Sequence, residues 1–192
     1  MRHLPVCAAI ALSIATPVLA QESAPPTCSY GEPSPLAPEE LMQFAFLIGD
    51  YRISLHAWRD GDWTPPQPGV TARWNGRYGL GGVTIVDEWY NPDPAQDPSG
   101  NRGINVRMYD EDAGEWDMMW VATSDHQVQD LRARIINGVL TMWQVYPERS
   151  DFRAEFHVED EDHWSRIEHR REENGEWTPL YKLSASRIPC GD

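Results

Sequence analysis

Five residues near the middle of the chain combine aromatic rings with polar groups at a spacing that predicts a binding site. Asn105 and Arg107 alternate with apolar residues, and Trp116 and Trp120 follow an acidic turn that contains glycine. If Tyr109 and Trp116 pair across that turn, all five side chains share one face of an antiparallel hairpin. An aromatic wall with a few placed polar groups is typical of a small-molecule pocket. The alternatives are an Arg107 that stacks on tryptophan at the surface, or one that pairs with a core carboxylate.

A histidine late in the chain is the second candidate for chemistry. A four-residue loop at 159–162 pairs Phe152 with His169, and a three-residue loop at 173–175 places Tyr181 on the same face. His169 is therefore predicted to point inward between two aromatic side chains, where it could transfer a proton or ligate haem iron. The alternative is a histidine at the rim of the core, hydrogen-bonded to its neighbours.

Motifs for other chemistries are missing from the sequence. It contains no zinc-ligand spacing, no phosphate-binding glycine loop and no Gly-x-Ser-x-Gly nucleophile motif, so no metal site is predicted and the cofactor stays unassigned. The formal net charge is −14, from 30 acidic and 16 basic residues. A surface this acidic repels nucleic acid and anionic membranes, which leaves a small-molecule ligand as the predicted partner.

The first twenty residues have the pattern of a secretory signal. Arg2 and His3 precede an apolar run over 4–19, and the small residues Val18 and Ala20 predict cleavage after Ala20. The protein is therefore predicted to be periplasmic or secreted. The alternative is an uncleaved N-terminal anchor helix. Cleavage would leave 192 − 20 = 172 residues and a net charge of −14 − 1 = −15.

Two cysteines, Cys28 and Cys190, remain after that cleavage, one near each end of the mature chain. In an oxidising compartment they are predicted to form a disulfide that ties the N-terminal arm to the last strand. The alternative is a pair of free thiols.

The rest of the chain is predicted to be one all-β domain. Segment 21–38, rich in Pro and Ser, is predicted to be an irregular arm, and 39–190 to be the domain, which begins with a short helix after Pro38. Period-two patterns predict ten strands, at 50–59, 69–78, 82–90, 103–109, 116–122, 128–137, 139–146, 151–158, 163–171 and 177–187. Sequential hairpins without intervening helices favour an antiparallel up-and-down β-barrel over a sandwich, since closure removes exposed edges.

Two further predictions concern the direction of side chains. A two-residue turn at Asn137-Gly138 pairs Arg132 with Trp143 on the outer face, as an exposed cation–π contact. The loop at 173–175 turns Trp177 toward the interior.

Several motifs occur in an order that resembles a known family. They are Phe46 to Tyr51, Leu80 to Gly82, Asp87 to Trp89, Tyr109 to Trp116, Asn174 to Trp177, and Arg187. In this order they resemble an exported bacterial family of lipocalin-like domains of unknown function in the calycin group, over 44–187. The resemblance implies that an aromatic residue after Gly49 closes one barrel end and that a late arginine packs on it. Here that pair is Tyr51 and Arg187, with Tyr where the family has Trp.

The predicted function is non-covalent binding of an amphipathic or apolar small molecule in the barrel cavity of an exported protein. The residues predicted to contact the ligand are Asn105, Arg107, Trp116, Trp120, His169 and Tyr181. One alternative is an enzyme that uses His169 or an acid for proton transfer in the cavity. Another is a haem carrier, by analogy with calycin-group barrels that use one late-strand histidine. The patterns predict neither the ligand nor the oligomeric state.

Overall fold

The computed structural model describes residues 28–66, 72–93, 100–124 and 126–190. The predicted signal segment, 1–20, and the first part of the predicted arm, 21–27, lie outside the described residues. Residues 28–38 form turns and irregular backbone ahead of the first helix. In the described part of the chain, no helix has both the length and the apolar character to cross a membrane.

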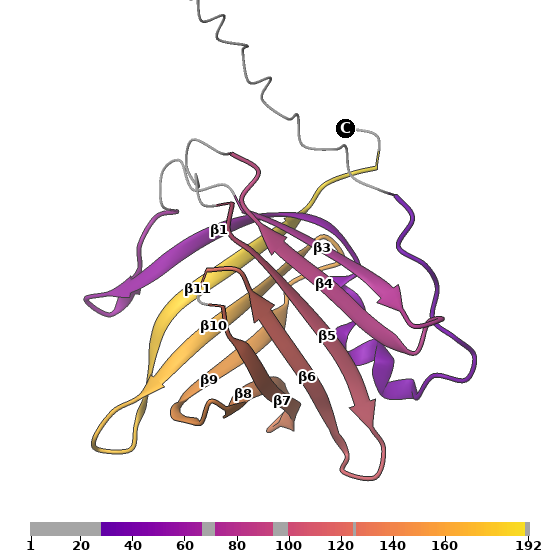
Figure 1. Ribbon diagram of the computed structural model, residues 1–192. Coiled ribbons are helices and arrows are strands. Elements are labelled where there is room, and N and C mark those ends of the chain that lie inside the picture. The colour runs from indigo at the N-terminus through magenta and orange to yellow at the C-terminus, as the bar shows by residue number, and fades with distance from the viewer. Residues whose placement is uncertain (1–27, 67–71, 94–99, 125, 191–192) are drawn as a thin grey trace, which may run out of the picture.

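Within the described residues, one short helix precedes eleven strands, and all of these strands pair antiparallel (Figure 1). The elements are η1 (Glu39–Leu47), a 3₁₀ helix, then β1 (Gly49–Arg59), β2 (Asp62–Trp63), β3 (Ala72–Gly79), β4 (Thr84–Tyr90), β5 (Arg102–Asp110), β6 (Glu115–Ala122), β7 (Val128–Ile136), β8 (Val139–Tyr146), β9 (Arg149–Val158), β10 (His163–Arg171) and β11 (Trp177–Arg187). From β3 to β11 each strand pairs with the next along the chain, and β1 pairs with both β3 and β11. The predicted fold class is confirmed: β1 and β3 to β11 close an antiparallel barrel, and the two-residue β2 only extends a hairpin with β1.

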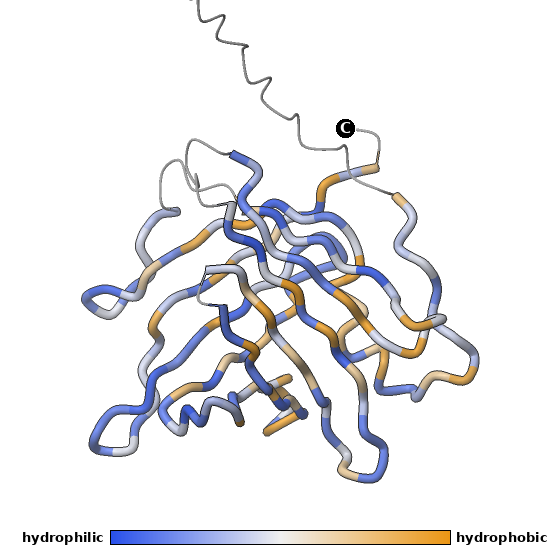
Figure 2. Tube along the Cα trace, viewed as in Figure 1, coloured by the Kyte–Doolittle hydropathy of each residue, from blue (hydrophilic) through white to orange (hydrophobic). Residues whose placement is uncertain are grey.

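The strands bury alternate side chains, as a closed barrel requires. In β5, for example, Asn105 and Arg107 are buried, while Met108 is half exposed. Figure 2 shows orange and blue alternating along the strands, with blue, hydrophilic residues at the hairpin between β10 and β11. The interior of the barrel is therefore the core, and it is filled mainly by aromatic and aliphatic side chains.

Helix η1, the dark purple coil in Figure 1, packs against one end of the barrel. Its side chains Leu41, Phe44 and Leu47 are fully buried. Gly76 on β3 makes this approach possible, because the carbonyl of Leu47 occupies the space that a Cβ would need. The Phe44 ring meets Trp116 of β6 edge to face, at 4.8 Å between centroids. This end of the barrel is closed.

Tyr51 and Arg187 pair directly across β1 and β11 at the closed end. The guanidinium of Arg187 lies 4.8 Å from the centre of the Tyr51 ring and donates a hydrogen bond to the carbonyl of Ile48 at 2.9 Å. Gly49 has a φ of 137°, and its missing side chain leaves room for that guanidinium. The predicted Cys28–Cys190 disulfide is confirmed, and it joins the segment before η1 to the residues after β11.

Two of the predicted hairpin registers are confirmed. Tyr109 pairs with Trp116, and Asn105 with Trp120, so the face predicted for the β5–β6 hairpin is the inner one. The β7–β8 hairpin has the predicted two-residue turn at 137–138.

The predicted cation–π contact is wrong in one partner. Arg134, not Arg132, lies over the Trp143 ring, at 5.5 Å from its centre. Arg132 is directly paired with Asp117 on β6, and their side chains form an ion pair at 2.9 Å. This carboxylate draws the Arg132 guanidinium away from the tryptophan.

The predicted register of the β9–β10 hairpin is wrong by one residue. Val158 pairs with Trp164 rather than His163, because residues 159–163, one more than predicted, connect the paired positions. A slip of one residue turns every side chain of a strand to the other face. Arg166 and Glu168 therefore point into the barrel, and His169 points outward.

A β-bulge in the last hairpin compensates for this slip. Near the turn, His169 pairs with Pro179, which is the predicted register, but the register shifts between Glu168 and His169. Beyond the bulge, Glu168 pairs with Tyr181 and the predicted inward direction of Tyr181 is preserved. Trp177 lies before the bulge on the outer face, stacked under Arg153, so its predicted inward direction is wrong.

Candidate functional site

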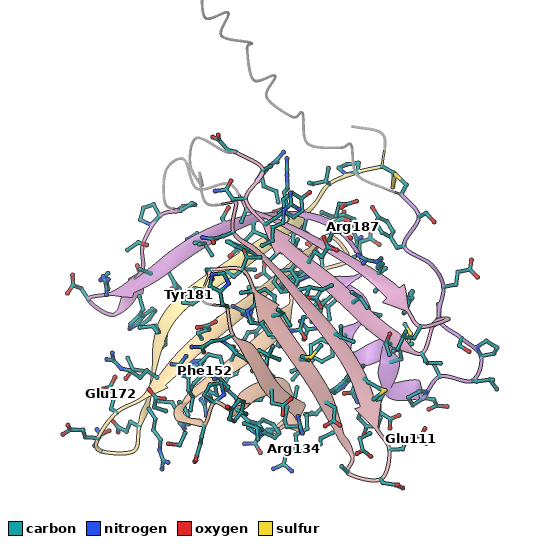
Figure 3. The ribbon with its side chains drawn as sticks, viewed as in Figure 1. Glu111, Arg134, Phe152, Glu172, Tyr181 and Arg187 are labelled. Atoms are coloured by element: carbon teal, nitrogen blue, oxygen red, sulfur yellow. A yellow bond between two sulfur atoms is a disulfide. The ribbon has the colours of Figure 1, made fainter. Side chains whose placement is uncertain are left out.

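A cavity of about 320 Å³ occupies the barrel toward the end opposite η1. Its volume falls at the lower end of the range typical of small-molecule sites. Every strand except the two-residue β2 contributes to the wall, so the whole barrel holds the cavity in shape. The lining residues are Leu55, Trp74, Trp89, Asn105, Trp120, Gln129, Leu131, Met142, Gln144, Arg149, Phe152, Arg166, Glu168, Tyr181 and Leu183. Figure 3 labels two of them, Tyr181 on β11 and Phe152 on β9.

Aromatic rings form much of the cavity wall. Trp74 and Trp89 are cross-strand partners on β3 and β4, and Trp120 comes from β6. Trp120 lies over Gly103 on β5, where a side chain of any size would overlap the indole ring. The sequence thus places glycine at the position that lets the indole lie flat against the sheet. These rings offer large, rigid surfaces for an apolar or aromatic ligand.

A charged cluster on β10 and β11 gives the same cavity a polar side. Arg166 donates hydrogen bonds at 2.7 Å to both the carboxylate of Glu168 and the hydroxyl oxygen of Tyr181. The Tyr181 hydroxyl in turn donates to Glu168 at 2.8 Å. Burial and the neighbouring carboxylate raise the pKa of Tyr181 to about 12, although the guanidinium of Arg166 opposes the rise. The phenol is therefore protonated at neutral pH and completes a closed triangle of charge-assisted hydrogen bonds.

Three polar atoms on the cavity-lining side chains are buried without a hydrogen-bond partner. They are the Oδ1 of Asn105, the Nε1 of Trp74 and the Nε of Arg166. A buried polar group without a partner costs free energy, and most such groups in proteins find one. One acceptor and two donors of the lining side chains thus lack a hydrogen-bond partner within the protein.

Arg107, a predicted ligand contact, is committed to an ion pair deeper in the core. Its Nε and Nη2 donate to the two carboxylate oxygens of Asp87 at 2.6 and 3.2 Å. Its guanidinium also lies 4.5 Å from the centre of the Phe44 ring. Neither Arg107 nor Asp87 lines the cavity. The sequence left two alternatives to ligand binding for Arg107, stacking on a surface tryptophan or pairing with a core carboxylate, and the structure shows the second.

Trp116, also predicted to contact a ligand, holds the closing helix instead. Its indole nitrogen donates a hydrogen bond of 3.0 Å to the side-chain oxygen of Gln43 on η1. The ring is fully buried between Phe44 and Tyr109. Trp116 is absent from the cavity wall.

His169 lies on the outer face of β10, so the predicted inward orientation is wrong. Its Nε2 is 3.9 Å from a carboxylate oxygen of Glu155 on β9. Burial lowers the pKa of His169, although the carboxylate of Glu155 opposes this effect. Among the described residues that line the cavity there is no histidine. The haem alternative, and the enzyme alternative in which His169 transfers the proton, both required this histidine to point into the barrel, and it points outward.

The cavity brings together three of the six predicted ligand contacts, which are Asn105, Trp120 and Tyr181. Sequence reasoning missed Arg166 and Glu168, because the predicted four-residue loop at 159–162 places both on the outer face of the strand. A signal was present in the sequence. Trp164, Arg166 and Glu168 are spaced two residues apart, so they share one face of β10, and a strand face that carries a tryptophan is a candidate for the interior. Within the described residues, no group of three or more His, Cys, Asp or Glu side chains is placed to hold a metal ion.

Comparisons with known proteins found a distant structural similarity. No protein-family model and no curated protein sequence matches the chain. Among solved structures, the chain is similar to the S-type phycobiliprotein lyase CPES from Guillardia theta. The two share 10% sequence identity at a TM-score of 0.49, and the match covers 77% of this chain and 92% of the lyase. The closed barrel of sequential antiparallel strands with its covering helix is lipocalin-like.

Proposed function

We propose that this protein is an exported carrier that holds a small amphipathic molecule in the barrel cavity, with an aromatic or apolar part and at least one polar group. The unpartnered buried atoms of Asn105, Trp74 and Arg166 carry the proposal. They match a ligand that offers an acceptor to the indole and guanidinium N–H groups and a donor to the amide oxygen. The tryptophan rings would cover its apolar part.

Export is supported by features at both ends of the chain. The basic start and apolar run of 1–20 have the composition of a signal peptide. The Cys28–Cys190 disulfide fits an oxidising compartment outside the cytoplasm.

Binding of 8-anilino-1-naphthalenesulfonate (ANS), an aromatic anion, tests the proposal with two conservative substitutions. Arg166→Lys keeps a positive charge beside Glu168 but removes the Nε donor. We expect about tenfold weaker binding, since a hydrogen bond between charged groups contributes at least ~1.5 kcal/mol. Trp74→Phe keeps a ring but removes the indole donor, and we expect about fivefold weaker binding from a loss of ~1 kcal/mol.

Trp164→Phe is the matched control for Trp74→Phe. Trp164 is 1% exposed, packs on Trp74 at 5.3 Å between ring centres, and does not line the cavity. The control should bind ANS with the wild-type dissociation constant. If Arg166→Lys and Trp74→Phe both bind ANS as the wild type does, the cavity is not the binding site and the proposal fails.

A further inference from the structure

A second hollow, a groove of about 730 Å³, runs along the outer face of β8 and β9. Two tryptophans, Trp143 of β8 and Trp177 of β11, line it together with Thr141 and Val139. It lies on the opposite side of the barrel wall from the cavity. Three residues, Gln144, Arg149 and Phe152, line both the cavity and the groove.

The barrel wall is interrupted where these three residues lie. Met142 pairs with Ala154, but the next pair along is Gln144 with Arg149. Residues 150–153 of β9 therefore face a single residue of β8, Trp143, and the regular ladder of the two strands is broken there. Between the cavity and the groove the wall consists of side chains rather than paired backbone.

Side-chain contacts hold this part of the wall closed. The guanidinium of Arg149 lies 4.8 Å from the centre of the Phe152 ring. Gln144 donates a hydrogen bond of 2.7 Å to the carbonyl of Pro147 in the turn between the two strands. On the cavity side, Phe152 is followed on the same face of β9 by Ala154, which pairs with Glu168 of the charged cluster. Phe152 therefore lies between the groove and this cluster.

The groove suits a planar aromatic anion. Arg134 lies over the Trp143 ring at 5.5 Å and Arg153 lies over the Trp177 ring at 4.6 Å. Arg153 forms an ion pair with Glu155 at 3.0 Å, but its Nε is buried and has no hydrogen-bond partner. Guanidinium groups beside aromatic rings offer a flat anion a local binding surface in a protein whose overall charge is −14, and the groove is also lined by Glu148 and Glu155.

We propose that this groove is the loading site of the barrel, at which a planar aromatic anion stacks against Trp143 and Trp177 before it enters the cavity between β8 and β9 past Phe152. This inference rests on the proposed function, because the groove supplies the ligand that the cavity holds. Binding then has two steps, association in the groove followed by opening of the wall.

Stopped-flow mixing with ANS separates these two steps. In the wild type, the observed rate should rise with ANS concentration and reach a plateau set by the opening step. Trp143→Ala should lower the initial slope about fivefold and leave the plateau unchanged. A fivefold change lies within the range expected for the loss of one aromatic contact. Phe152→Ala should raise the plateau several-fold, and Phe152→Leu should raise it less.

Two control variants make the kinetic test specific. Trp63→Ala removes a tryptophan that meets Trp58 edge to face at 4.9 Å between ring centres and lines neither the groove nor the cavity, so it should keep wild-type rates. Leu183→Ala alters the cavity wall away from the groove, so it should change the dissociation rate and leave the plateau unchanged. Circular dichroism and the melting temperature establish that each variant is folded.

A linear concentration dependence of the rate, or wild-type slopes in Trp143→Ala, would overturn the loading site. So would a plateau that is the same in the wild type and in both Phe152 variants. These outcomes are distinct from failure of the proposed function. If the function fails, Arg166→Lys and Trp74→Phe leave the equilibrium affinity for ANS unchanged; if only the loading site fails, they still weaken it.

Discussion

The buried ion pair between Asp87 and Arg107 provides a sharp test of how the core is stabilised. Asp87 is 0% exposed and Arg107 is 1% exposed, and two hydrogen bonds of 2.6 and 3.2 Å join them. Arg107→Met fills similar space but leaves a carboxyl group in the core without its partner. Removing one member of a buried pair typically costs about 3–5 kcal/mol. This is a large fraction of the stability of about 5–15 kcal/mol that a single domain has.

The pH dependence of that loss follows from the environment of Asp87. Burial raises the pKa of Asp87, and Arg107 opposes the rise, so removing Arg107 raises the pKa further. A carboxyl whose pKa is higher in the folded than in the unfolded chain is stabilised when it is protonated. Its contribution is present below the unfolded pKa and is lost as pH rises through the folded pKa. The stability deficit of Arg107→Met should therefore be smaller at about pH 5 than at about pH 8.

Urea unfolding at both pH values measures the deficit. The matched control is Arg77→Met, which breaks the Arg77–Glu88 pair, at 3.4 Å and with both side chains about two-fifths exposed. It should cost at most about 1 kcal/mol, as solvent-exposed pairs do. The double variant Arg107→Met/Asp87→Leu should recover most of the loss, because no charge then remains in the core. A deficit of Arg107→Met below about 1 kcal/mol, or one that grows as pH falls, would refute this reasoning.

Two further predictions concern the tyrosines and the disulfide. Burial raises the pKa of Tyr51 and of Tyr181 to about 12, above an ordinary value of about 10, so both phenols stabilise the fold below pH ~10 and lose that contribution as the pH rises toward 12. Ultraviolet absorbance should show late-titrating tyrosines, with Tyr51 and Tyr181 among them, together with falling stability; ionisation of all tyrosines near pH ~10 in the folded protein would contradict this. Reduction of Cys28–Cys190, which are 162 residues apart, should lower the free energy of unfolding by about 5 kcal/mol in the chain-entropy treatment. Equal urea midpoints with and without reductant would argue against it.

The fold could be predicted from the sequence because its signals are local. The turn at Asn137-Gly138 and the pairing of Tyr109 with Trp116 each specify a register through a few neighbouring residues. Period-two alternation then fixes which face is buried. Once most hairpins are sequential, closure of β11 on β1 follows, since no other strand is left to cover either edge.

The polar side of the cavity could not be predicted by the same rules. Arg166 and Glu168 are charged, and a local pattern assigns charged residues to solvent. They lie inside because each neutralises the other and Tyr181 completes their hydrogen bonds, an arrangement that involves a second strand and a bulge. The five-residue connection at 159–163 decides which face of β10 is inner, and its length depends on turn geometry that composition does not specify. The error at His169 has the same origin.

The position of Arg107 illustrates the difference between burial and availability. The hairpin pattern placed it inside, and it is inside. Its partner Asp87 lies on β4, 20 residues earlier, and the two strands meet only when the barrel forms. A pattern within one hairpin therefore predicts that Arg107 is buried but does not predict that its charge is already neutralised.

The crystal structure of the protein with ANS tests the central claim, that the barrel cavity is the ligand site, most directly. We predict the aromatic rings of the probe against Trp74 and Trp120, with the sulfonate within hydrogen-bond distance of the Nε of Arg166. A complex in which ANS lies only on the outer surface of the barrel, with the cavity side chains unmoved and no probe between them, would contradict the account.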